Sequence, residues 1–233
     1  MTEYINLYLD RDDFNDRIGG GIPKGSLMII EGQEGEGKSI ISQRITYGSL
    51  INNATVSYIS TELNILDFVR QMDSLNYNIT EYLLSNKLLF VSTLSLFSKV
   101  KDKGNLIMEL MKSKSKKIFE KDIIIIDSLS YPLIDNLSKK DVRILIDFFS
   151  RIKSMNKILI LTFDPTIIDS YFANELRRVA DIYFKVGITT IAGSLTRYIE
   201  IKRFRNPKSM YNMMIPFRVE PGLGLIIEIV TVV

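Results

Sequence analysis

Eight consecutive residues near the N-terminus have the types and spacing of a phosphate-binding loop. They follow the Walker A pattern G-x-x-x-x-G-K-S and are Gly32, Gln33, Glu34, Gly35, Glu36, Gly37, Lys38 and Ser39. The glycines let backbone N–H groups turn toward phosphate oxygens, Lys38 can reach the β- and γ-phosphates, and the Ser39 hydroxyl can ligate Mg²⁺. The motif predicts a nucleoside triphosphate with Mg²⁺. The alternative is a glycine-rich strand-to-helix turn without a ligand.

Two acidic residues lie where apolar runs end. Asp127 ends four consecutive isoleucines, and α/β sheets bind their ligands at the carboxyl ends of such strands. We interpret Asp127 as the Walker B acid, which helps to hold Mg²⁺; the alternative is that it caps the following turn. Glu62 follows the strand expected at residues 56–60 and can serve as the general base that activates water. Its alternative is a surface glutamate near a helix N-terminus.

Four further polar residues lie on or after later strands. Thr162 and Asp164 close the strand expected at residues 158–163 and can sense a γ-phosphate, although strand-end placement fits a structural role equally well. Arg203 and Arg205 alternate on a late strand, so both side chains point to one face. Two guanidinium groups there suit a phosphate across a subunit boundary. A charged, solvated sheet edge is the alternative.

The composition excludes several kinds of chemistry. The chain has 233 residues, of which 46% are hydrophobic, and a formal net charge of +3; these values favour a folded domain over a disordered chain or a dedicated nucleic-acid-binding protein. It contains no cysteine and no histidine, which excludes disulfides, thiolate metal sites and a histidine base. We expect neither a signal peptide nor insertion into a membrane, and interpret the protein as soluble and cytoplasmic.

The chemistry requires strands that end side by side. Apolar runs that read as strands lie at residues 27–30, 56–60, 88–91, 122–127 and 158–163. Helical patterns between them predict an α/β fold, a parallel sheet with helices on both faces. After Asp181, consecutive strands separated by turns predict an antiparallel C-terminal extension. No linker or repeat divides the chain, so we expect one domain over residues 1–233.

Helix start signals support this alternation. Asn64 reads as an N-cap, and Ser138 with Asp141 reads as a capping box. Residues 106–111 also read as a helix, and the Lys-rich run at residues 112–117 reads as a solvated helix face or loop.

Taken together, these residues resemble the RecA/KaiC-like P-loop ATPases. The run Ile-Gly-Gly-Gly-Ile-Pro-Lys-Gly-Ser at residues 18–26 precedes Walker A, and Asp127 is followed by Ser128 and Leu129. Residues 199–205 and 217–222 are similar to one branch of this group, the ArlH (FlaH) family of archaellum accessory proteins. The resemblance extends from about residue 16 to the C-terminus.

This resemblance implies roles for the residues named above. Gly32 to Ser39 would bind ATP and Mg²⁺, Asp127 would support the metal, and Glu62 would match a catalytic glutamate. Arg203 and Arg205 would stand where KaiC-like proteins place a Lys-x-Arg pair that reaches the neighbouring subunit's nucleotide.

The resemblance also implies partners. The family is single-domain, tends to form hexameric rings with ATP at the subunit interface, and docks at the periphery of the membrane-embedded archaellum motor. Its partners there are the motor ATPase ArlI, the platform protein and the ring-forming scaffold, and no nucleic acid is expected. We therefore expect an ATP-binding accessory protein whose nucleotide state controls ring assembly and docking.

One departure from the family pattern bears on catalysis. KaiC-like ATPases usually carry two adjacent glutamates after the second strand, whereas Glu62 is followed by Leu63, so hydrolysis is expected to be slow or absent. A KaiC-like ATPase with regular turnover is one rival. A RecA/RadA-like DNA-binding paralogue is another, but it requires a separate DNA-binding module or basic aromatic loops, and residues 129–137 are not basic.

Overall fold

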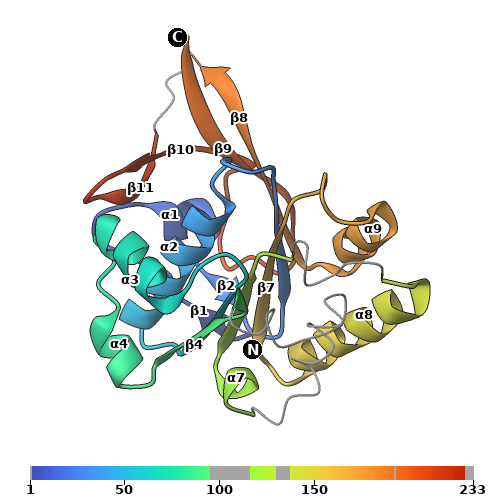
Figure 1. Ribbon diagram of the computed structural model, residues 1–233. Coiled ribbons are helices and arrows are strands. Elements are labelled where there is room, and N and C mark those ends of the chain that lie inside the picture. Colours follow the sequence, from blue (N-terminus) through green and yellow to red (C-terminus); the bar gives the residue numbers. More distant parts are fainter. Residues whose placement is uncertain (1, 95–115, 130–136, 192, 229–233) are drawn as a thin grey trace.

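The structure, a computed structural model, describes residues 2–94, 116–129, 137–191 and 193–228 (Figure 1). Its centre is a nine-stranded sheet. In spatial order the strands are β11 (Gly224–Ile227), β10 (Met214–Glu220), β9 (Ser194–Phe204), β8 (Ile182–Ile191), β3 (Leu27–Glu31), β7 (Ile158–Phe163), β6 (Ile123–Asp127), β4 (Val56–Ser60) and β5 (Leu88–Ser92). A separate antiparallel ribbon pairs β1 (Tyr4–Ile5) with β2 (Ile22–Pro23).

The sheet has a parallel part and an antiparallel part. All neighbours from β8 to β5 pair in parallel, whereas β9, β10 and β11 pair antiparallel. This confirms the α/β fold with a parallel core and a C-terminal antiparallel extension. The change of direction comes one strand later than expected, because β8 still runs parallel to β3. Helix α9 (Ser170–Val179), which was not predicted from the sequence, connects β7 to β8 and lets β8 run in the same direction as β3.

Helices cover both faces of the sheet (Figure 1). One face carries α1 (Phe14–Arg17), α2 (Lys38–Ile51), α3 (Ile65–Ser74) and α4 (Thr80–Leu84). The other carries α7 (Lys116–Glu120), α8 (Lys139–Ser154) and α9. Among the described residues, no helix has both the length and the apolar composition needed to cross a membrane.

The isoleucine strand β6 shows why both faces must be covered. Ile123 and Ile125 belong to the hydrophobic core under α2 and α3, while Ile124 and Ile126 belong to the core under α8 and α9. Because successive strand side chains point to opposite faces, an apolar run without alternation requires two cores. Asp127, the next residue, is thereby held at the carboxyl edge of the sheet.

The helix start signals are confirmed where the structure describes them. The Asn64 side chain accepts hydrogen bonds from two backbone N–H groups at the start of α3, and Ser138 and Asp141 form a capping box at the start of α8. The helix expected at residues 106–111 lies outside the described residues, as does most of the Lys-rich run.

A buried ion pair anchors α2, the helix that follows the Walker A residues. The Arg44 guanidinium donates to both carboxylate oxygens of Asp12, at 2.6 and 2.8 Å, and to the carbonyl oxygen of Leu7. Both charged side chains are almost completely buried. Because a buried charge is costly without its partner, this pair fixes the N-terminal segment against α2.

Candidate nucleotide-binding site

The Walker A residues form a tight loop between β3 and α2. Gly35 and Gly37 adopt positive φ angles of 78° and 106°, a region that favours glycine. The Lys38 ammonium donates to the carbonyl oxygen of Gln33 at 2.7 Å, closing the loop on itself. The first backbone N–H groups of α2 have no acceptor within the helix, so the start of α2 favours an anion.

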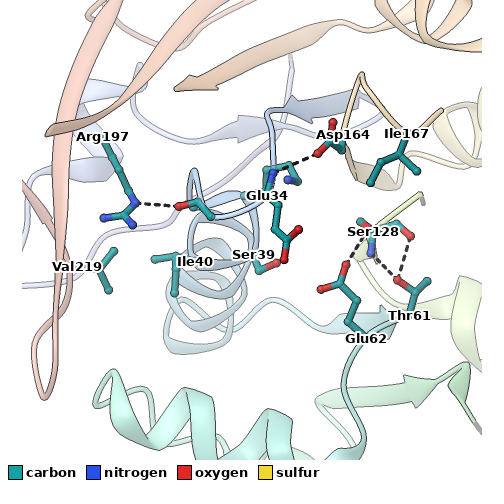
Figure 2. Close-up of a pocket in the computed structure, with 13 residues that line it drawn as sticks. Glu34, Ser39, Ile40, Thr61, Glu62, Ser128, Asp164, Ile167, Arg197 and Val219 are labelled. Atoms are coloured by element: carbon teal, nitrogen blue, oxygen red, sulfur yellow. Dashed lines mark hydrogen bonds between the residues drawn. The ribbon is translucent and has the colours of Figure 1, made fainter. Parts of the chain in front are cut away.

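The loop borders a cavity of about 670 Å³ (Figure 2), a size typical of small-ligand sites. The residues that line it are Glu34, Gly35, Gly37, Lys38, Ser39, Ile40, Thr61, Glu62, Ser128, Asp164, Ile167, Arg197 and Val219. Figure 2 shows Thr61, Glu62 and Ser128 on one side of Ser39 and Arg197, Ile40 and Val219 on the other. We call Thr61, Glu62, Ser128 and Asp164 the strand-end wall, and Arg197 with Val219 the extension wall.

Asp127, the last residue of β6 and the neighbour of Ser128, accepts three hydroxyl hydrogen bonds. Ser39 Oγ donates to it at 3.2 Å, Thr162 Oγ1 at 2.7 Å, and the Tyr58 hydroxyl binds its other oxygen. Burial and then the negative charge of Asp127 raise the pKa of Tyr58 well above its usual value, so Tyr58 stays protonated as a donor. The carboxylate is buried and held in one orientation.

Ser39 and Asp127 fit a magnesium ion by their chemistry. They offer a hydroxyl and a carboxylate oxygen side by side, and Mg²⁺ prefers oxygen ligands and takes the remainder from water and phosphates. No cluster of three or more acidic, histidine or cysteine side chains suitable for a metal occurs among the described residues. Two side-chain oxygens suit a metal that takes its remaining ligands from phosphate and water.

Glu62 faces the cavity from the end of β4. The Ser128 hydroxyl donates to its carboxylate at 3.3 Å. Partial burial and then the charge of Asp127 raise the pKa of Glu62. A carboxylate whose pKa is raised accepts a proton more readily, which suits the general-base role expected from the sequence. That role stays a prediction.

The two sensor candidates have different positions. Thr162 is fully buried, is not among the residues that line the cavity, and donates its hydroxyl to Asp127. Asp164 lines the cavity and accepts a hydrogen bond from the backbone N–H of Glu34 at 3.1 Å. Asp164 can therefore register a change in the loop directly, whereas Thr162 can do so only through Asp127. Sensing by either residue stays a prediction.

Arg203 and Arg205 do not line the cavity of their own chain. Arg203 Nη1 donates to the carbonyl oxygens of Arg177 and Ala180, at 2.7 and 2.9 Å, at the C-terminal end of α9. Arg205 Nη1 lies 3.3 Å from a carboxylate oxygen of Asp181. Arg203 thus stabilises a helix end within its own chain. Contact of either arginine with a neighbouring subunit's nucleotide stays a prediction.

The extension wall was not predicted from the sequence. Arg197, on β9, donates from Nε to the carbonyl oxygen of Gly35 at 3.2 Å. Phe217, on β10, is fully buried, and its ring packs so closely that a Cβ on Gly37 would lie 3.0 Å from it. The sequence predicted a late strand here but carried no signal that this strand lies beside the loop.

The fold and this cavity define a RecA-type α/β protein with a phosphate-binding loop. Comparison with known proteins agrees: the family model described as "ATPase: KaiC" matches residues 12–230. A crystal structure of a KaiC-like protein from Pyrococcus horikoshii superposes with a TM-score of 0.75 over 98% of this chain and all of that one, at 18% identity. That likeness concerns the fold alone.

Three findings identify the branch of the family. The archaeal flagellar ATP-binding protein FlaH of Methanocaldococcus jannaschii is 39% identical over all of this chain and 99% of its own length. FlaH of Methanococcus voltae is 38% identical over 99% of both chains. The crystal structure of the M. jannaschii flagellar accessory protein FlaH superposes with a TM-score of 0.89 over 98% of this chain and 100% of that chain. The chain belongs to the KaiC-like family and, within it, to the FlaH family.

Proposed function

We propose that this chain binds ATP with Mg²⁺, and that its nucleotide state controls assembly into a ring and docking on the archaeal flagellar motor. The observation that carries the proposal is the convergence on one cavity of Lys38, the start of α2 and Ser39, whose hydroxyl is hydrogen-bonded to Asp127. The printed names of the relatives, archaeal flagellar ATP-binding proteins, support both the ligand and the setting.

The residues of the cavity suggest how a nucleotide would be held. Lys38 would exchange the carbonyl oxygen of Gln33 for the β- and γ-phosphates, because an ammonium binds a charged oxygen more strongly than a neutral one. Ser39 and Asp127 would hold the magnesium ion, which neutralises phosphate charge when bound. Tyr58 and Thr162 would keep the Asp127 carboxylate in place.

Apolar side chains near the strand-end wall support the ring. Ile167 lines the cavity and is 53% exposed, and Ile65 and Leu66 at the start of α3 are 42% and 65% exposed. Exposed apolar patches mark interaction surfaces, and a second copy seated here would cover the nucleotide. We propose that six copies close a ring, which docks at the membrane periphery onto the motor ATPase, the platform protein and the ring scaffold.

The substitution Lys38→Ala tests this proposal. We expect it to abolish both ATP binding, measured by calorimetry, and ring formation, measured by light scattering after gel filtration. The matched control is Lys202→Ala, since Lys202 is an exposed lysine that pairs with Glu200 and should leave both unchanged. Wild-type rings that persist after complete removal of nucleotide would contradict the coupling.

A second candidate function is regular ATP turnover, which the position and raised pKa of Glu62 favour. The variant Glu62→Gln keeps the size of the side chain and removes the base. If the chain is a steady ATPase, phosphate release should fall about 100-fold or more in this variant while ATP affinity is retained. Wild-type phosphate release no faster than that of Glu62→Gln would exclude turnover by this residue.

A further inference from the structure

Among the described residues that line the cavity, Arg197 is a cation that no motif accounts for. Among the described residues that line the cavity, the charged ones are Lys38, Arg197, Glu34, Glu62 and Asp164. Acids therefore outnumber cations in the lining, and Asp127, the neighbour of Ser128, adds another. A triphosphate entering this cavity needs positive charge beyond Lys38 and one metal ion, and Arg197 is the other side chain that can supply it.

The present contact of Arg197 leaves its charge uncompensated. Its Nε donates to the carbonyl oxygen of Gly35, and no carboxylate lies within ion-pair distance of it among the described residues. A guanidinium has five N–H donors in a planar fork that suits phosphate oxygens. Arg203 on the same strand, by contrast, already donates hydrogen bonds to carbonyl oxygens at the end of α9.

The backbone places Arg197 at a definite part of the site. It pairs with Ile188 of β8 on one side and with Phe217 of β10 on the other, so β9 holds it between two strands. Its Cδ atom would lie 3.5 Å from a Cβ on Gly37, which puts its stem against the start of α2. In Figure 2 it lies across Ser39 from Glu62 and Ser128. Glu62 and Ser128 lie on the side where the proposed function would put the γ-phosphate, and Arg197 lies on the opposite side of Ser39.

We propose that Arg197 binds the non-terminal phosphates of the nucleotide within its own subunit, releasing the Gly35 carbonyl oxygen when ATP or ADP enters. The inference rests on the proposed ATP binding and adds a ligand from the antiparallel extension. It makes the extension part of the nucleotide site. Because the contact is to phosphates shared by both nucleotides, it serves ATP and ADP alike.

The test is a calorimetric titration of the full-length protein, stripped of nucleotide, with ATP and with ADP in the presence of Mg²⁺. We expect Arg197→Ala to weaken both affinities by the same factor, about 10- to 100-fold, the range for loss of a charged hydrogen bond. Lys202→Ala, which removes a charge from the same strand on its exposed side, should change neither. Equal affinities in wild type and Arg197→Ala would overturn the proposal. A loss of affinity confined to ATP would also overturn it, since it would indicate that Arg197 contacts the γ-phosphate, which ADP lacks.

Two conservative variants test whether Arg197 binds phosphate or only stabilises the loop through its hydrogen bond to Gly35. Arg197→Lys keeps the charge, whereas Arg197→Gln keeps a neutral N–H donor that can still reach Gly35. We expect Lys to recover part of the affinity and Gln to behave like Ala, with unchanged melting temperatures without nucleotide. Recovery by Gln, or an equal fall in melting temperature in the Ala and Gln variants, would show a structural brace. Wild-type protein that binds neither nucleotide would overturn the proposed function itself.

Discussion

The two walls of the cavity come from two parts of one sheet and are held in different ways. In the strand-end wall, Ser128 is hydrogen-bonded to Thr61 and Glu62, and three hydroxyl donors fix the neighbouring Asp127 carboxylate. In the extension wall, the Arg197 guanidinium donates to a neutral carbonyl oxygen. The first wall is thus pre-organised before a ligand arrives, while the second carries a charge that has no carboxylate partner among the described residues.

This difference shows how a parallel core and an antiparallel extension can divide one task. Carboxyl ends of parallel strands meet at one edge, so they can present acids to a metal. An antiparallel strand crosses beside the loop and can bring a long cationic side chain from the opposite direction. The position of the extension beside the loop depends on Phe217, whose ring packs against Gly37.

Of the variants considered, Phe217→Ala should have the largest effect, because it should disturb the extension wall and leave the strand-end wall in place. Removing a fully buried phenylalanine should cost about 3–5 kcal/mol of unfolding free energy. It should also weaken nucleotide binding, because the Phe217 ring packs the extension against the Walker A loop. Chemical denaturation and calorimetry measure the two effects. Phe172→Ala, at an equally buried phenylalanine on the other face of the sheet, should lose similar stability without a change in affinity. Equal affinities in the two variants would contradict the role of Phe217.

Glu31→Gln should lower the stability of the fold by an intermediate amount, through a contact in the parallel part of the sheet. Glu31, the last residue of β3, accepts two hydrogen bonds from Arg177 and one from Tyr183. Burial by itself would raise the pKa of Glu31, but the hydrogen bonds from Arg177 and Tyr183 outweigh it and lower the pKa below 4.5. Burial and Glu31 raise the pKa of Tyr183 to about 12, which keeps it a donor.

The sign of the pH dependence follows from that lowered pKa. The stabilisation by Glu31 is complete above the unfolded pKa near 4.5 and is lost as the pH falls through the folded pKa. We expect Glu31→Gln to cost about 2 kcal/mol at pH 7 and progressively less below pH 4.5, as measured by urea denaturation. Glu200→Gln, at a partly exposed pair with Lys202, should change stability little at any pH. A cost that stays constant down to pH 3 would argue against this ion pair.

Arg203→Ala should have the smallest effect and sharpens the contrast between two arginines of β9. Loss of its contacts to the end of α9 should cost about 1 kcal/mol of stability. Nucleotide affinity, measured by calorimetry at concentrations where the chain is monomeric, should not change, whereas Arg197→Ala should weaken it. A monomer affinity that falls equally in both variants would remove the distinction.

Local patterns were enough to predict the strand-end side of the molecule. The isoleucine run before Asp127 and the glycines of the loop each determine their own conformation, so the parallel core and the positions of Ser39 and Asp127 follow from sequence. Helix α9 was missed, although Asp169 as an N-cap and Phe172 with Leu176 on one face were signals for it. Arg197 and Arg203 could not be told apart, because strict alternation places residues six apart on one face. A bulge shifts the register between the pairs Tyr183–Arg203 and Phe184–Ile201, so Arg203 turns to the end of α9 while Arg197 lies against the loop.

The most direct test of the central claim is a crystal structure of the protein grown with ATP and Mg²⁺. We expect the triphosphate to lie along the Walker A loop with its metal at Ser39, beside Asp127, and with the Arg197 guanidinium moved from Gly35 onto a non-terminal phosphate. A loop that remains closed on itself, with Lys38 still on the Gln33 carbonyl oxygen and the cavity free of nucleotide, would contradict the claim.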